Sequence, residues 1–294
     1  MYVSPKFSST LTGSTPWEWI PLNFDYFLEE LDGIKDYAEE SGHLLLYRGQ
    51  SDINWLLDST FVRFCKEHVF GINQCAKLRE DFRLSIEHQQ IVGNLLLFKF
   101  GFATVPSKEL FECERLYGID PWFEWLKRLQ QYGEDDKLHL KGTFIMDWTD
   151  KAEVAVYFSN YCRRGDGGVW ICDATVTGRT LQLITVAEIL GKMKEGILNN
   201  RGLGIPLMFY PRKQIASERA SNQGAIYFAQ MDLRFDLSEI WSVYEKERNN
   251  KEKVFIKLVL PITVSNDECT KWLVDRGITR NYLFPDETRD LKRG

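Results

Sequence analysis

The sequence predicts an α+β protein with a mixed central sheet and helical insertions. Helical periodicity dominates up to about residue 141, whereas strand-like apolar segments alternate with helices from Gly142 onward. No internal repeat, low-complexity tract or long linker divides the 294 residues. A helix-rich first half and a strand-rich second half without a linker favour one mixed domain.

The first 42 residues are expected to form an N-terminal helical lead-in. Apolar residues recur at helical spacing between Asn23 and Glu40, and Ser41-Gly42 supplies a stop. A strand is expected from His43 to Tyr47, where apolar side chains follow one another. Residues 43–287 are then expected to form the main domain.

A helical insertion is expected within this domain at about residues 58–141. Apolar residues give an amphipathic face between Asp58 and about Gly101, and a further helix opens at Pro121 and ends at Gly133. Residues 91–102 are apolar, and their pattern fits a helix and a strand equally well. Residues 134–141 are expected to form a polar loop.

The second half of the chain supplies most of the predicted sheet. Strands are expected at GTFIMDWT, GGVWICDATV, AIYFAQMDL and KVFIKLVLP, and helices at AEVAVYFSNYC and TVAEILGKMKEGIL. Ser265 to Glu268 form a capping box, which predicts a last helix through about Asp275.

Composition and charge argue against several classes of protein. The net charge of −5 and the pI of about 5.6 give no overall field that would hold a nucleic acid, although a local basic cleft is compatible with them. The longest apolar run is far shorter than the roughly 20 residues of a membrane helix, and the first residues lack an apolar signal core. We therefore expect a cytoplasmic protein that does not associate with a membrane.

Six cysteines without CxxC spacing and four unclustered histidines predict no metal site.

Three short stretches place polar residues at the edges of predicted elements, and the first is Tyr47-Arg48-Gly49-Gln50. The apolar run before it brings Arg48 to the end of a core strand. Glycine lets another backbone or a ligand come close, and the guanidinium offers a planar fork of donors that suits a diphosphate or a carboxylate.

The second stretch, Met146-Asp147-Trp148-Thr149-Asp150, lies between a predicted strand and a predicted helix. Thr149 or Asp150 can serve as the helix N-cap, which is the structural interpretation. The functional interpretation is a phosphate or ribose site at the helix N-terminus, with Asp147 paired to an arginine or bound to a sugar hydroxyl.

The third stretch runs from Arg219 to Gln223-Gly224 and leads into a strand. A glutamine before a glycine is frequently only a turn residue. In a cleft, the Gln223 amide can hold a ribose hydroxyl or a nucleobase, but it cannot accept a proton at neutral pH.

Taken together, these stretches resemble the FRG domain family. The family's first motif is similar to Tyr47-Arg48-Gly49-Gln50, and its Asp-Trp-Thr element is similar to Asp147-Trp148-Thr149. Its later Arg-x-x-x-Gln-x-Gly element is similar to Arg219 through Gly224, and its ending to Gly277 through Asp286. One departure is Gln131, which stands where the family has a histidine.

The resemblance implies an ADP-ribosyltransferase-like fold and NAD as substrate. By this analogy, Arg48 would hold NAD, Asp147-Trp148-Thr149 would line the nicotinamide pocket, and Gln223 would lie at the reacting ribose. Breaking the glycosidic bond needs a carboxylate or a polarised hydroxyl near the developing positive charge, and Asp147 or Glu218 would supply the carboxylate unless the site binds NAD-like ligands without turnover. Arg219 and the whole Tyr47 to Gln50 motif would belong to the cofactor-binding set.

Three hypotheses follow from these residues. The first is an NAD-consuming transferase or glycohydrolase, such as a bacterial toxin or phage-defence effector, with an unidentified protein or nucleic acid as acceptor. The second is a non-catalytic module that binds a nucleotide or a protein, because residue 223 is a glutamine rather than a carboxylate. The third is that Arg48 and Asp147 form a buried ion pair that only stabilises the fold.

Overall fold

One mixed β-sheet organises the protein. The computed structural model describes residues 10–12, 17–78, 83–92, 143–177, 179–180, 207–209, 218–230, 232–247 and 254–285. The strands in these ranges are β1 (Thr10–Thr12), β2 (Glu18–Pro21), β3 (Leu45–Gln50), β4 (Ile145–Thr149), β5 (Gly167–Asp173), β6 (Arg179–Thr180), β7 (Leu207–Phe209), β8 (Ala225–Ala229) and β9 (Phe255–Leu260). They lie in the order β1-β2-β9-β5-β3-β4-β8-β7-β6, with parallel pairs only at β2–β9 and β6–β7. The predicted α+β class with a mixed sheet is therefore confirmed.

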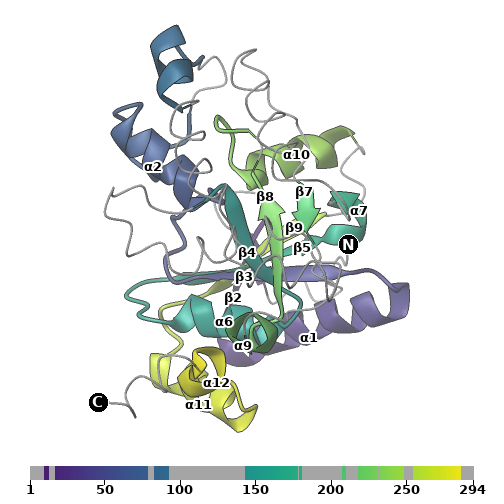
Figure 1. Ribbon diagram of the computed structural model, residues 1–294. Coiled ribbons are helices and arrows are strands. Elements are labelled where there is room, and N and C mark those ends of the chain that lie inside the picture. Colours follow the sequence, from purple (N-terminus) through teal and green to yellow (C-terminus); the bar gives the residue numbers. More distant parts are fainter. Residues whose placement is uncertain are drawn as a thin grey trace, which may run out of the picture.

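Helices cover both faces of this sheet (Figure 1). They are α1 (Phe24–Ser41), α2 (Thr60–His68), α6 (Ala152–Asn160), α7 (Ala174–Thr177), α9 (Glu218–Asn222), α10 (Leu237–Glu247), α11 (Asn266–Asp275) and α12 (Arg280–Leu283). One apolar core packs α1, α6 and α11 against the sheet, and a second core packs α7 and α10 against the opposite face. The sheet is thus buried from both sides, which explains why all seven residues of β5 are buried.

The N-terminal region contributes strands as well as the expected helix. Helix α1 begins after Asn23, whose side chain accepts a hydrogen bond from Tyr26 N, and it ends at Gly42 with a φ of 67°. This confirms the helix expected between Asn23 and Glu40. Strand β2 pairs in parallel with β9, at Glu18–Lys257 and at the next residue pair, so the segment before the helix belongs to the sheet. No local periodicity predicted this strand.

The strands expected in the second half are confirmed at β4, β5, β8 and β9, with shorter bounds. Strand β5 ends at Asp173, whereas the predicted segment continued to Val176. The reason is local, because Asp173 accepts hydrogen bonds from Val176 N at its carboxylate and from the Thr177 hydroxyl at its carbonyl, which turns the chain into α7. Helix α11 has the predicted N-cap, since Ser265 Oγ accepts a hydrogen bond from Glu268 N at 3.0 Å.

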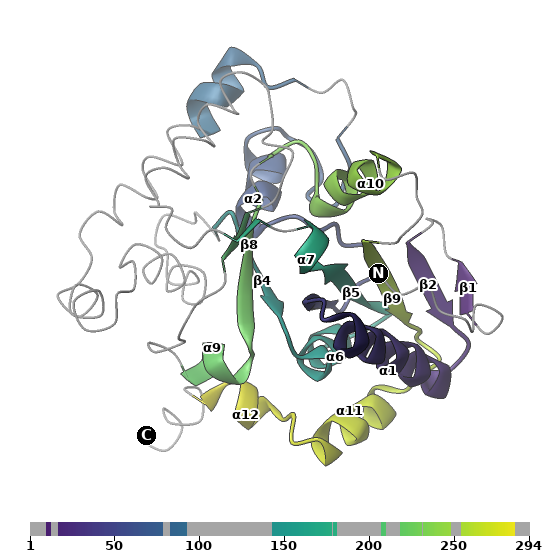
Figure 2. The same ribbon diagram turned by 90° about the vertical axis from the view of Figure 1, so that its right-hand side faces the viewer.

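The centre of the sheet is split between β3 and β4. Strand β3 pairs with β5 over all six of its residues, and β4 pairs with β8 over all five of its residues. By contrast, β3 and β4 share only the pair Tyr47–Thr149. Beyond this pair the two halves separate, and Figure 2 shows β4 and β8 turned away from β5 and β9.

Helix α6 packs tightly against β3 beside this split. A Cβ atom added at Gly49 would overlap the carbonyl oxygen of Ala155 and lie 2.6 Å from Ser159 N. Only a glycine allows the helix backbone to come this close to the strand. Gly49 therefore sets the distance between α6 and the sheet at the place where the strands part.

Several predicted elements lie outside the described residues. They are the helix expected from Pro121 to Gly133, the loop at 134–141, the helix expected at TVAEILGKMKEGIL, and most of the segment at 91–102. Within the ranges given above, no helix is long and apolar enough to cross a membrane.

Candidate functional site

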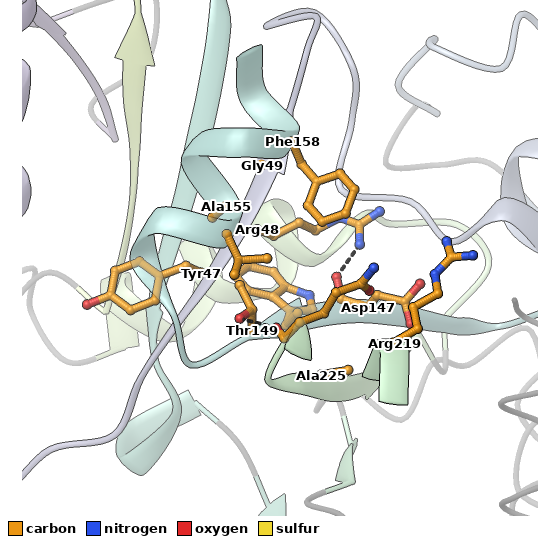
Figure 3. Close-up of a pocket in the computed structure, with 12 residues that line it drawn as sticks. Tyr47, Arg48, Gly49, Asp147, Thr149, Ala155, Phe158, Arg219 and Ala225 are labelled. Carbon is orange, nitrogen blue, oxygen red and sulfur yellow. Dashed lines mark hydrogen bonds between the residues drawn. The ribbon is translucent and has the colours of Figure 1, made fainter. Parts of the chain in front are cut away.

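A cavity of about 220 Å³ lies where β3 and β4 part (Figure 3). The three polar stretches that the sequence singled out meet around it, although Arg48 and Gln223, for example, are 175 residues apart in the chain. The residues that line it come from β3, from β4, from α6, and from α9 with the turn into β8: Tyr47, Arg48, Gly49, Asp147, Trp148, Thr149, Val154, Ala155, Phe158, Arg219, Gln223 and Ala225. The cavity at the split in the sheet is therefore lined by residues of all three motifs.

Arg48 bridges the two halves of the sheet. It lies inside β3, paired with Trp170 of β5, rather than at the end of the strand as its sequence context predicted. Its Nη1 donates a hydrogen bond to the carbonyl oxygen of Asp147 in β4 (Figure 3), and its Nε is buried without a hydrogen-bond partner. A half-buried guanidinium whose only hydrogen-bond partner among the described residues is neutral is suited to receive an anionic group.

The electrostatic environment of Arg48 supports this interpretation. Burial lowers the pKa of the Arg48 guanidinium from 12.5 to about 10, the nearby Asp147 carboxylate opposes this shift, and Arg63 adds to it. Arg48 nevertheless stays charged at neutral pH, because a pKa of about 10 lies well above 7. Its charge is thus largely removed from water and close to a second cation.

Asp147 is the carboxylate residue that lines the cavity. The Arg48 guanidinium hydrogen-bonds to the carbonyl of Asp147, and in the described part of the chain no ion pair within 4.0 Å joins it to the carboxylate. The third hypothesis expected such a pair; the structure joins Arg48 to the backbone of Asp147 and leaves the carboxylate near enough to attract the guanidinium charge. Glu218, the other carboxylate considered from the sequence, is exposed and does not line the cavity.

Arg219 supplies a second guanidinium to the same cavity. Its Cζ lies 4.5 Å from the ring centre of Phe284, and its Nε is buried without a hydrogen-bond partner. Figure 3 shows the Arg219 and Arg48 side chains reaching toward the same region, with Asp147 between them. Two guanidinium groups with unused donors therefore face one carboxylate across the cavity.

The Thr149 hydroxyl joins β4 to the turn before β8. It donates to the carbonyl oxygen of Gln223 at 2.6 Å and accepts from Lys151 N at 3.0 Å. The N-cap residue of α6 is Lys151, without a side-chain cap hydrogen bond, so neither Thr149 nor Asp150 caps the helix as the structural interpretation suggested. Thr149 lines the cavity, but its hydroxyl already makes two hydrogen bonds to the protein backbone.

Gln223 is held in place through its amide nitrogen. Nε2 donates to the carbonyl oxygen of Leu283 at 3.1 Å, which leaves Oε1 without a hydrogen bond among the described residues. The following Gly224 has a φ of 55°, and a Cβ there would overlap Asp150 Oδ1. The turn that the sequence suggested is therefore present, and it presents the amide at the edge of the cavity.

Three of the predicted cofactor-binding residues have other roles. Gln50 is buried outside the cavity, where Oε1 accepts from Trp170 Nε1 at 2.8 Å and Nε2 donates to the Leu56 carbonyl at 3.2 Å. The Tyr47 ring points away from the cavity into the α1–α6 core (Figure 3), and burial raises the pKa of its hydroxyl. The Trp148 ring packs edge-on against Phe228 and Trp241.

The cavity also contains residues that the sequence reasoning missed. Val154, Ala155 and Phe158 form its wall on α6, and Ala225 lies at the start of β8. The spacing of Val154 and Phe158, four residues apart on a predicted helix that directly follows the Asp-Trp-Thr strand, was the available signal for this wall. Among the described residues, no group of three or more His, Cys, Asp or Glu side chains is placed to hold a metal ion.

Comparisons with models of protein families, with curated proteins and with solved structures found no match for this chain. The resemblance to the FRG domain family consequently stays a prediction. What defines the site is its own geometry, namely a split sheet, two arginines, one aspartate and an oriented glutamine.

Proposed function

We propose that this protein binds NAD, with the nicotinamide ribose in the cavity between β3 and β4, and that it transfers the ADP-ribose group to an acceptor or to water. The observation that supports this most is the Arg48 guanidinium at the split, which is half-buried and makes its one hydrogen bond among the described residues to a neutral carbonyl. A negatively charged ligand would pair with this guanidinium and offset the cost of holding its charge partly out of water. The diphosphate of NAD is such a group, and Arg219 lies within its reach.

Asp147 is the residue that we assign to the charge-stabilising role. In the proposed reaction the bond between ribose C1′ and the nicotinamide nitrogen breaks, and its electron pair leaves with nicotinamide. An oxygen or nitrogen of the acceptor then bonds to C1′ and releases a proton. The ribose carries positive charge in the transition state, and the half-buried Asp147 is the carboxylate residue of the cavity that is suited to stabilise it.

Gln223 has a positioning role in this proposal. Its carboxamide cannot carry a negative charge or take up a proton, but its Oε1 can accept a hydrogen bond from a ribose hydroxyl. The hydrogen bond from Nε2 to Leu283 O fixes the direction of this acceptor. Gly49 also lines the cavity, and the space that its side chain would take is filled by the backbone of α6, which forms the wall there.

The test is incubation of the purified protein with NAD labelled in the adenine half, with and without cell lysate. We expect free nicotinamide together with free or macromolecule-bound ADP-ribose. Asp147→Asn and Arg48→Lys should each lower product formation at least about 100-fold, the size of effect expected when one electrostatic contact of a transition state is lost. Arg276→Ala, which removes an exposed arginine of the turn after α11, should react like the wild type.

Folding of each variant is checked by circular dichroism and by its thermal unfolding midpoint. Arg48→Lys keeps the buried positive charge and loses the planar fork, so it separates a specific role from a structural one. A folded Asp147→Asn protein that turns NAD over at the wild-type rate would remove aspartate from the mechanism. A wild-type protein that neither binds nor consumes NAD would refute the proposal.

A second candidate function is nucleotide binding without turnover. Gln223 favours it, because a carboxamide stands at the edge of the cavity where a carboxylate would support catalysis better. This candidate requires saturable NAD binding by calorimetry, loss of binding in Arg48→Lys, and no release of nicotinamide after long incubation. Release of nicotinamide from the wild type alone would exclude it.

A further inference from the structure

A strip of aromatic rings leads from the cavity to the protein surface. Phe158 lines the cavity, and its ring centre lies 6.1 Å from that of Phe284, just after α12. Phe284 in turn lies 6.4 Å from Tyr157, and Tyr157 stacks on Tyr161 with ring centres 5.7 Å apart. The outer ring, Tyr161, is 40% exposed. We call these four residues the ring strip.

Two arginines follow the strip outward. Arg219, a cavity residue, and Arg280 of α12 lie over the same Phe284 ring, with their Cζ atoms 4.5 Å and 5.9 Å from its centre. Arg280 also lies 5.6 Å from the ring centre of Tyr161 and donates a hydrogen bond from Nη1 to the Tyr161 hydroxyl at 2.7 Å. The strip therefore ends in an exposed pair, a tyrosine ring and a guanidinium held beside it.

The size of the cavity requires such an extension. Its volume of about 220 Å³ lies below the range of roughly 300–1,000 Å³ that is usual for pockets enclosing drug-sized ligands. A dinucleotide that places its nicotinamide ribose there must therefore extend its other half beyond the cavity. The ring strip begins at Phe158, which lines the cavity, and the cavity residue Arg219 lies over its second ring, Phe284.

We infer that the ring strip is the binding surface for the adenosine half of the ligand, with the diphosphate between Arg219 and Arg280 and the adenine ring against Tyr161 and the Arg280 guanidinium. This inference rests on the proposed function for the identity of the ligand inside the cavity. Aromatic rings and guanidinium planes are the surfaces on which nucleobases stack, and guanidinium groups pair with phosphate. The substrate class is accordingly a dinucleotide rather than a mononucleotide.

The test measures binding of ADP, which lacks nicotinamide, by isothermal titration calorimetry, beside NAD and nicotinamide mononucleotide. ADP should bind the wild type, and NAD should bind at least about tenfold more tightly than the mononucleotide. Tyr161→Ala and Arg280→Ala should each weaken ADP about tenfold, a change consistent with the loss of one stacking surface. Tyr161→Phe keeps the ring and should keep most of the binding.

Arg276→Ala is the matched control, because this guanidinium also lies over a ring, 4.1 Å from the centre of Trp272, but outside the strip. The replaced strip residues are exposed, so the variants are expected to fold, and their thermal unfolding midpoints are measured alongside.

The outcomes separate this inference from the proposed function. Turnover of NAD by the wild type with equal ADP binding in all variants would overturn the inference and leave the proposed function standing. ADP binding that depends on Tyr161 and Arg280 without any turnover of NAD would support the inference and refute catalysis. A short single-stranded oligonucleotide that binds through these residues when ADP does not would overturn the inference in favour of a nucleic acid. If neither NAD nor ADP binds, both the inference and the proposed function are wrong.

Discussion

Replacement of Gly49 by alanine tests how the cavity is built. The added Cβ would overlap the Ala155 carbonyl oxygen and lie 2.6 Å from Ser159 N and 2.9 Å from Ala155 C. All three atoms belong to the backbone of α6, so no side chain can rotate away. Extra methylene groups in well-packed cores typically cost about 1–3 kcal/mol, and a clash with a packed helix backbone should lie at or above the top of this range. We expect Gly49→Ala to lower the free energy of unfolding by at least about 3 kcal/mol.

Gly168→Ala is the matched control, because Gly168 pairs with Gln50, the residue that follows Gly49 in β3. A Cβ at Gly168 of β5 would meet only the Lys257 side chain, at 3.2 Å from Cε and 3.4 Å from Cγ. A flexible side chain can yield by a few tenths of an ångström, so Gly168→Ala should cost less than about 1 kcal/mol.

Urea unfolding followed by tryptophan fluorescence and by circular dichroism measures both variants. Equal slopes of free energy against urea would show that the midpoints report stability alone. A Gly49→Ala protein within about 1 kcal/mol of the wild type would refute the reasoning, since it would mean that α6 can move away from β3 at little cost.

Two further predictions concern the buried polar groups beside α2 and α10. Lys66→Met should lower the free energy of unfolding in urea by about 3–5 kcal/mol, because it leaves the buried Asp58 carboxylate without its 2.5 Å partner. The double variant Lys66→Met/Asp58→Asn removes both charges, and an equal loss of stability in it would contradict this cause. Burial, with a contribution from Asp236, raises the pKa of Glu239 from 4.5 to about 7. The protonated Glu239 side chain is favoured in the folded protein, so its contribution to stability is full below about pH 4.5 and is lost as the pH rises through 7. Because glutamine does not titrate, the free energy of unfolding of Glu239→Gln should rise by about 1 kcal/mol relative to the wild type between pH 5 and pH 8, after allowance for solvent screening. Thermal unfolding measured across this pH range without such a relative rise would contradict the assignment.

Local signals in the sequence predicted several helices and strands and several residues of the cavity. Helix α1 was predictable because its apolar period is bounded by Asn23 and Gly42, both of which act as caps. Helix α11 was predictable from the capping box at Ser265, and the core strands from their apolar runs. The cavity contains Arg48, Asp147 and Gln223, all of which were singled out in the sequence as polar residues at the edges of predicted strands and helices.

The tertiary structure alone decided which atoms these residues meet. Arg48 and Gln50 point to the same side of β3 by strand periodicity, yet Arg48 bridges to a carbonyl 99 residues away while Gln50 accepts a hydrogen bond from Trp170. The split of the sheet, the pairing of β2 with β9, and the approach of α6 to Gly49 depend on strand order and register. Contacts between distant segments set these properties, and no pattern within a window of neighbouring residues encodes them.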